Sequence, residues 1–171
     1  MPKTKFQGLV FGLLMSYFMA YGMEVYNVAI KMGYASDFSQ MSGSVFLAAF
    51  KEALYMGLIV FAFSNLFGNR LGAKFAARHV TESDNPYFCM LMRQAGTVAV
   101  MCPSMSLAAS ILFNVILGGS PVSSLPAIWV GTLIKNFPMA LCWNMFAAAP
   151  LTRLVFSLLF TRRNGRHAVA T

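Results

Sequence analysis

Four charged side chains lie within long apolar runs of this sequence, where they could bind a solute or pair with one another. They are Glu24, Lys51, Glu52 and Lys135. Ionisable groups inside a membrane are costly unless they face protein or water, so they often mark functional sites. With a rise of about 1.5 Å per residue, Glu24 and Lys51 lie about 9 Å from the same membrane boundary. We therefore expect Glu24 and Lys51 to form an ion pair.

Helical spacing predicts which way these side chains face. Glu24 ends a ridge with a small residue at every fourth position, made of Gly8, Gly12, Ser16, Ala20 and Glu24. Small residues let helices approach closely, so Glu24 should face protein, and Gly8 and Gly12 could hold a homodimer together. A second small and polar ridge consists of Asn136, Ala140, Asn144 and Ala148. Amides complete the set of ligand or ion-pair candidates, namely Asn27, Asn114 and Asn136.

Four apolar runs must position these residues, and each is long enough to cross a membrane. The chain of 171 residues is 58% hydrophobic and 11% charged, whereas soluble domains carry about 25% charged residues. About twenty apolar residues span a bilayer core, and the runs cover residues 6–30, 45–67, 89–117 and 127–151. The sequence predicts an all-α fold, an integral membrane four-helix bundle.

Basic residues fall almost entirely on one side of the predicted bundle. They are Lys3, Lys5, Arg70, Lys74, Arg78, Arg93, Arg153, Arg162, Arg163 and Arg166, against Lys31 on the other side. Because cytoplasmic flanks are rich in Lys and Arg, we expect both termini in the cytoplasm, with the chain in the bacterial cytoplasmic membrane. The net charge of +8 then reflects orientation and attraction to anionic lipid headgroups, not binding of nucleic acid.

The two halves of the chain align as copies of one hairpin. Lys51 corresponds to Lys135, and Arg70 with Leu71 corresponds to Arg153 with Leu154. Each copy enters and leaves on the same side, so the two form a parallel repeat. We assign residues 1–80 to the first hairpin, 81–88 to a cytoplasmic linker, and 89–171 to the second hairpin with its basic tail.

One difference between the copies affects the charges. Ile111 stands in the second copy where the first has Glu24, so Lys135 has no carboxylate in its own hairpin. We expect Glu52 to pair with Lys135 across the repeat interface. Alternatively, the other three charges only hold helices together, and Lys135 extends its ammonium to the membrane surface.

Several segments resemble a known bacterial membrane family. They are residues Pro2 to Lys5, Tyr26 with Asn27, Lys135 to Trp143, and Ala149 to Arg153. In these segments the chain resembles Domain of Unknown Function 2798, whose members are similar to one hairpin, so that this chain looks like two copies in tandem. The resemblance implies no activity, because none is established for the family. Leu54 stands where the second copy has Pro138, so the role of that proline is not shared.

The residue types argue against an enzyme. No histidine lies within a predicted span, and Cys89, Cys102 and Cys142 have neither disulfide nor metal spacing. Methionines at every fourth position from residue 15 to 23 would suit Cu(I), but methionine more often fills irregular helix packing. We expect no catalytic residues, no cofactor and no metal.

Two classes of function stay open. One is a small-solute or ion transporter with a polar site at the repeat interface, because parallel repeats and charges within the membrane are typical of such proteins. The other is a structural or partner-binding membrane protein whose intramembrane charges specify assembly.

Overall fold

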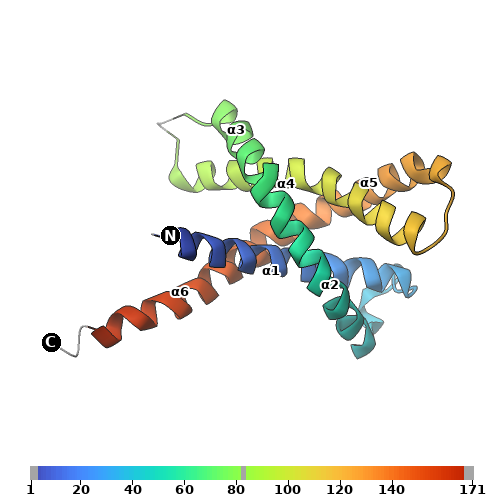
Figure 1. Cartoon of the computed structure of the whole chain (residues 1–171), viewed down its shortest axis with the longest axis horizontal. Helices are drawn as coiled ribbons and strands as arrows, with labels where there is room; N and C mark the ends of the chain where they lie inside the picture. Colours follow the sequence, from blue (N-terminus) through green and yellow to red (C-terminus); the bar gives the residue numbers. More distant parts are fainter. Residues whose placement is uncertain (1–3, 82–83, 168–171) are drawn as a thin grey trace. The chain divides into compact units, whose positions relative to one another are not determined.

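The computed structural model describes residues 4–81 and 84–167, with side chains placed as far as residue 160. Some of the basic residues that predict the orientation lie outside this part, namely Lys3 and the side chains of Arg162, Arg163 and Arg166. Within the described residues all regular structure is helical and there is no strand (Figure 1). Four helices are long and apolar enough to cross a membrane: Lys5–Lys31, Gly43–His79, Pro86–Ile116 and Val122–Phe160. The predicted all-α fold with four helices of membrane-spanning length is therefore confirmed.

The first spanning helix has well-defined ends. In α1 (Lys5–Lys31), the side chain of Thr4 caps the N-terminus by accepting a hydrogen bond from the backbone N–H of Gln7 at 3.2 Å. Such a cap satisfies one of the first N–H groups, which have no partner within the helix. Just beyond the C-terminus, Gly33 has a φ of 91°. This left-handed conformation favours glycine and ends the helix sharply.

Residues 1–61 and 145–171 form one compact unit. Its elements are α1, the short turn η1 (Phe38–Gln40), α2 (Gly43–Phe63), and α6 (Ala149–His167), which follows the π-helical turn η5 (Asn144–Ala148). Near the loop between α1 and α2, a buried cluster joins the two helices; it consists of Val28, Ala29, Val45 and Ala49. Further along, the ring of Phe11 packs edge-on against Phe156 of α6, with centroids 5.4 Å apart. Apolar packing of α1 on both sides holds this unit together.

Residues 62–144 form the second compact unit. Its elements are η2 (Ser64–Gly68), α3 (Asn69–His79), α4 (Pro86–Ala109), η3 (Ser110–Ile116), η4 (Val122–Ser124) and α5 (Leu125–Trp143). Helix α3 packs closely on α4 where Gly72 meets Gly96: a Cβ added at Gly96 would lie 2.9 Å from the carbonyl oxygen of Gly72. Helix α4 also packs against α5, and Trp129 Nε1 on α5 donates a hydrogen bond of 3.0 Å to the carbonyl of Pro103 on α4.

The compact units cut across the boundaries that the sequence repeat suggests. The helical stretch from Gly43 to His79 contributes α2 to the first unit and α3 to the second, and the stretch from Leu125 onward contributes α5 to the second and α6 to the first. A unit defined by packing need not coincide with a unit of sequence repetition. The boundaries 1–80, 81–88 and 89–171 stay a prediction about the repeat.

A similar order of local elements occurs in each half of the chain. A helix is followed by a glycine with positive φ, then a 3-10 turn, a second helix and a π-helical turn, and the second half has an additional π-helical turn, η3, before its glycine. The glycines are Gly33 and Gly119, with φ of 91° and 65°. The two 3-10 turns begin at Phe38 and Val122, and the same sequence offset separates these residues as separates Lys51 from Lys135.

Candidate functional site

Two carboxyl groups meet near the loop that joins α1 to α2. Glu24 of α1 is 5% exposed, which confirms that it faces protein. Glu52 of α2 is partly buried, and its carboxyl group lies within hydrogen-bonding reach of the Glu24 carboxyl. Two carboxyl groups in contact repel each other when both are ionised, so this arrangement needs a cation or a proton nearby.

Lys31, the last residue of α1, supplies a cation to this acidic pair. Its Nζ lies 3.3 Å from Oε2 of Glu52, and the two side chains are 48% and 24% exposed. The ammonium also attracts the Glu24 carboxylate electrostatically. We call Glu24, Glu52 and Lys31 the acidic cluster.

The predicted ion pair between Glu24 and Lys51 is wrong. Lys51 is exposed, and the pair that α1 and α2 form is Lys31 with Glu52. Consecutive residues on an α-helix point about 100° apart, so Lys51 and Glu52 cannot both face the same neighbour. Since Glu52 faces α1, Lys51 faces away from it.

The role of Lys31 was not predicted, because the first apolar run ends at residue 30 and Lys31 was expected to lie in the loop that follows. The helix instead continues through Lys31, which puts this residue two turns after Glu24 and on the same face. Extending the helical spacing from Glu24 by those two turns would have found it. Helix ends are the least certain feature of a sequence-based assignment, and here one residue changed the pairing.

The loop between α1 and α2 is ordered by a third acidic residue. Asp37 accepts hydrogen bonds from the hydroxyl and the backbone N–H of Ser39, at 2.5 and 3.0 Å, and from Gln40 Nε2 at 2.8 Å. The hydroxyl and then the N–H of Ser39 hold the pKa of Asp37 below its ordinary value, with Gln40 adding to the effect. Asp37 therefore caps η1 as a carboxylate.

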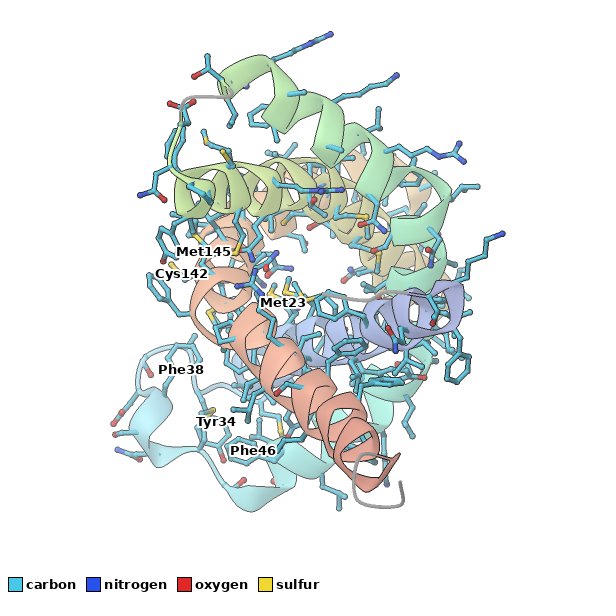
Figure 2. The ribbon with its side chains drawn as sticks, turned by 90° about the vertical axis from the view of Figure 1, so that its left-hand side faces the viewer. Met23, Tyr34, Phe38, Phe46, Cys142 and Met145 are labelled. Carbon is cyan, nitrogen blue, oxygen red and sulfur yellow. The ribbon has the colours of Figure 1, made fainter. Side chains whose placement is uncertain are left out.

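Aromatic side chains gather around the same loop. The ring of Phe38 stacks on Tyr26 of α1 with centroids 5.9 Å apart, and the Tyr34 hydroxyl donates to Ser42 Oγ at 3.3 Å. Figure 2 labels Tyr34, Phe38 and Phe46, which follow α1 or begin α2. Aromatic residues at the end of a spanning helix are typical of the membrane interface.

The remaining predicted residues are in varied environments. Asn27 on α1 is half-buried, and so is Asn114 in η3, whose carbonyl accepts a hydrogen bond from the Ser120 N–H at 2.9 Å. On α5, Asn136 is 5% exposed, whereas the neighbouring Lys135 is exposed. Glu52 belongs to the first unit and Lys135 to the second, so their pairing stays a prediction.

Two polar side chains that were not among the predicted site residues are buried in the second unit. Ser110 is 1% exposed and Asn144 is 3% exposed. Both occupy ridges with polar or small residues at every fourth position, and this spacing was the available signal. Lys135 was chosen from the sequence because it is charged. In the structure Lys135 is exposed, whereas the neutral Ser110 and Asn144 are buried.

Comparison with known proteins finds similarity to proteins of unknown activity. The model of the family described as Domain of unknown function (DUF2798) matches residues 4–72 of this chain, which fall within the first predicted hairpin. The uncharacterized protein YybC of Bacillus subtilis (strain 168) is 29% identical over 159 residues, which cover 91% of this chain and 92% of that protein. No solved structure matches the chain. Neither description assigns an activity.

Proposed function

We propose that this chain is a small membrane transporter for a solute or ion, without enzymatic activity, and that the acidic cluster is part of its binding site. The observation that carries this proposal is the buried Glu24 carboxyl group in contact with Glu52. Together with Lys31, two carboxylates and one ammonium leave one negative charge. An intramembrane carboxyl group with spare negative charge is suited to bind and release a proton or a cation.

A parallel tandem repeat is the architecture that we propose for this transporter, with the second half as a diverged copy of the family-like hairpin. The matching order of local elements in the two halves supports it, because the glycines, 3-10 turns and π-helical turns recur together. We place both termini in the cytoplasm of a bacterial cell, on the basis of the basic flanks. The exposed basic residues of α3, which are Arg70, Lys74 and Arg78, would then meet anionic lipid headgroups.

A structural or partner-binding role is the second candidate, and one observation favours it. Lys31 and Glu52 join the end of α1 to α2 across the outer loop, which is what a lock on a hairpin would do. In that case the charges stabilise assembly and no solute moves. A homodimer would use Gly8, where an added Cβ would meet nothing within 4 Å, more readily than Gly12, which already packs against Phe61.

Water access to the acidic cluster separates the two candidates. The variants Glu24→Cys and Glu52→Cys are made one at a time in a chain whose three native cysteines are replaced by serine or alanine. A membrane-impermeant thiol reagent is added to intact cells or to sealed vesicles of known orientation. Rapid labelling at both positions is expected for a transporter, because its site must open to water.

Protection of both positions, in variants that remain folded, would favour the structural role. Leu47→Cys serves as the control for reagent access to lipid-facing positions, because Leu47 is 61% exposed on α2. Labelling of residue 24 faster than residue 47 would show that water reaches the cluster by a path through the protein.

A further inference from the structure

The second unit contains three buried oxygen atoms that have no hydrogen-bond partner among the described residues. They are Oγ of Ser110, Oδ1 of Asn136 and Oδ1 of Asn144. The exposed fractions of these residues are 1%, 5% and 3%. Buried polar groups in proteins are almost always paired with protein, water or a ligand, because leaving one unpaired is destabilising. Three such atoms on neighbouring elements favour the binding of water, an ion or another ligand.

The unpaired atoms belong to elements that pack against each other within one unit. Ser110 follows α4, with the buried Ser106 one turn before it, and Asn136 lies on α5. Both α4 and η3 contact α5. Asn144 directly follows α5, two turns after Asn136, so the two amides are about 12 Å apart along the helix axis. The oxygens thus offer successive positions along a path, not a single cage.

Irregular helical structure coincides with these side chains. Ser110 is the first residue of the π-helical turn η3, and Asn144 is the first residue of the π-helical turn η5. Pro138 lies within α5 and lacks the N–H that would bond the carbonyl of Ile134. π-helical turns occur frequently at functional sites, and in membrane transporters interrupted helices present backbone carbonyls to cations.

We propose that this polar path, made of Ser110, Asn136 and Asn144, binds small monovalent cations. All three unpaired atoms are oxygens with free lone pairs, which can coordinate a cation or accept a hydrogen bond. The path has amide and hydroxyl groups where divalent ions usually require carboxylates. Alkali metal ions and ammonium can both bind to neutral oxygen atoms. The relative effects of Na⁺, K⁺ and ammonium on Tm show which of these cations the path prefers. The acidic cluster lies in the first unit, so this proposal stands or falls independently of the proposed transport function.

Thermal unfolding of the purified full-length protein in detergent tests the proposal. Chloride salts of Na⁺, K⁺ and ammonium are compared at constant ionic strength with the chloride of N-methyl-D-glucamine, a large organic cation. A saturable rise in Tm is expected with at least one small cation. A rise of about 2–4 °C would correspond to a cation concentration about five times the Kd.

Variants assign the effect to the path. Asn136→Leu and Ser110→Ala should each lose the cation-dependent rise in Tm, while unfolding in N-methyl-D-glucamine at the wild-type Tm or above it. The matched control is Ser104→Ala, because the Ser104 hydroxyl already donates to the carbonyl of Val100 at 2.9 Å; this variant should keep the rise. Asn136→Ser is the milder replacement if leucine prevents folding.

Two results would overturn the proposal. If Tm is the same in all four salts and Asn136→Leu only raises it, the oxygens are unoccupied or hydrated and bind no cation. If the cation effect persists in both Asn136→Leu and Ser110→Ala, the ions act elsewhere. Equilibrium binding of ²²Na⁺ to wild type and to both variants gives a readout that does not depend on stability.

Discussion

The acidic cluster and the polar path solve the problem of polar groups in a membrane protein in opposite ways. Near the loop between α1 and α2, Glu24 and Glu52 meet a cation that the chain itself supplies, Lys31. In the second unit, Asn136 and Asn144 are more deeply buried than Glu52 and still have unpaired oxygens. The charged residues therefore find partners within the chain, whereas the buried neutral amides have oxygens without a partner among the described residues.

The repeat makes this comparison direct, because Asn136 follows Lys135 as Glu52 follows Lys51. The same position in the two halves thus carries an acid in one and an amide in the other. Exchanging these residues, or disturbing the packing around them, tests whether the two environments are as different as the structure indicates.

The largest effect is expected from Asn136→Glu, which gives the second half the residue of the first. A carboxylate would be buried at this position, which is 5% exposed, and an uncompensated buried charge costs about 3–5 kcal/mol. Chemical denaturation should show a loss of this order at neutral pH. Asn136→Gln, which keeps the amide, is the control. Equal stability of the two variants would mean that the position is open to water.

A somewhat smaller effect is expected from Gly96→Val, which acts on the packing of α3 against α4. The added side chain would begin 2.9 Å from the Gly72 carbonyl oxygen, and overpacking of this kind costs about 1–3 kcal/mol. The variant should also lose the cation-dependent rise in Tm while residue 24 keeps its reactivity toward thiol reagents. Gly131→Val on α5, where an added Cβ meets nothing within 4 Å, should leave both measurements unchanged.

Replacing the two lysines near the acidic cluster separates the observed ion pair from the predicted one. Lys31→Met leaves Glu24 and Glu52 without their cation and should cost about 1 kcal/mol, since the pair is partly exposed to solvent. Lys51→Met should change the free energy of unfolding by no more than about 0.5 kcal/mol, as is usual for exposed positions. The reverse order of effects would restore the pairing of Glu24 with Lys51.

The smallest effect is expected at Asp37, in the loop between α1 and α2, when the pH is lowered. The polar path has no titratable side chain and should show no such effect. The pKa of Asp37 is lowered by its bonds to Ser39 and Gln40, so its contribution is present above the pKa of the unfolded chain and is lost as pH falls through the folded pKa. Amide hydrogen exchange at Ser39, corrected for intrinsic rates, should therefore lose protection below about pH 4. Asp37→Asn should show no such transition; a transition that persists in this variant would point to another group.

Properties of a single helix were predicted correctly from the sequence, whereas a contact between two helices was not. Helix positions followed from the length and hydropathy of the apolar runs, and the burial of Glu24 followed from the spacing of small residues before it. Both are properties of a single helix. The pairing of Lys51 failed because it depended on the rotation of α2 relative to α1 and on one more residue at the end of α1.

The unpaired oxygens of the polar path also could not be predicted from the sequence. The spacing of Asn136 and Asn144 is visible in the sequence, but whether their oxygens have partners depends on every side chain packed around them. Neutral amides can lie on a lipid-facing, hydrated or buried surface with the same local pattern. Burial and the neighbouring π-helical turns distinguish these cases, and both emerge only in the folded chain.

By itself, the sequence determined that this protein is helical, apolar enough for a membrane and punctuated by glycine at the turns, because these features depend on composition and on residues close along the chain. Tertiary structure alone decided that Lys31 pairs with Glu52, that α3 approaches α4 at Gly72 and Gly96, and that three buried oxygens stay unpaired. Such outcomes depend on distances between residues far apart in the chain, and these distances are set by the packing of whole helices.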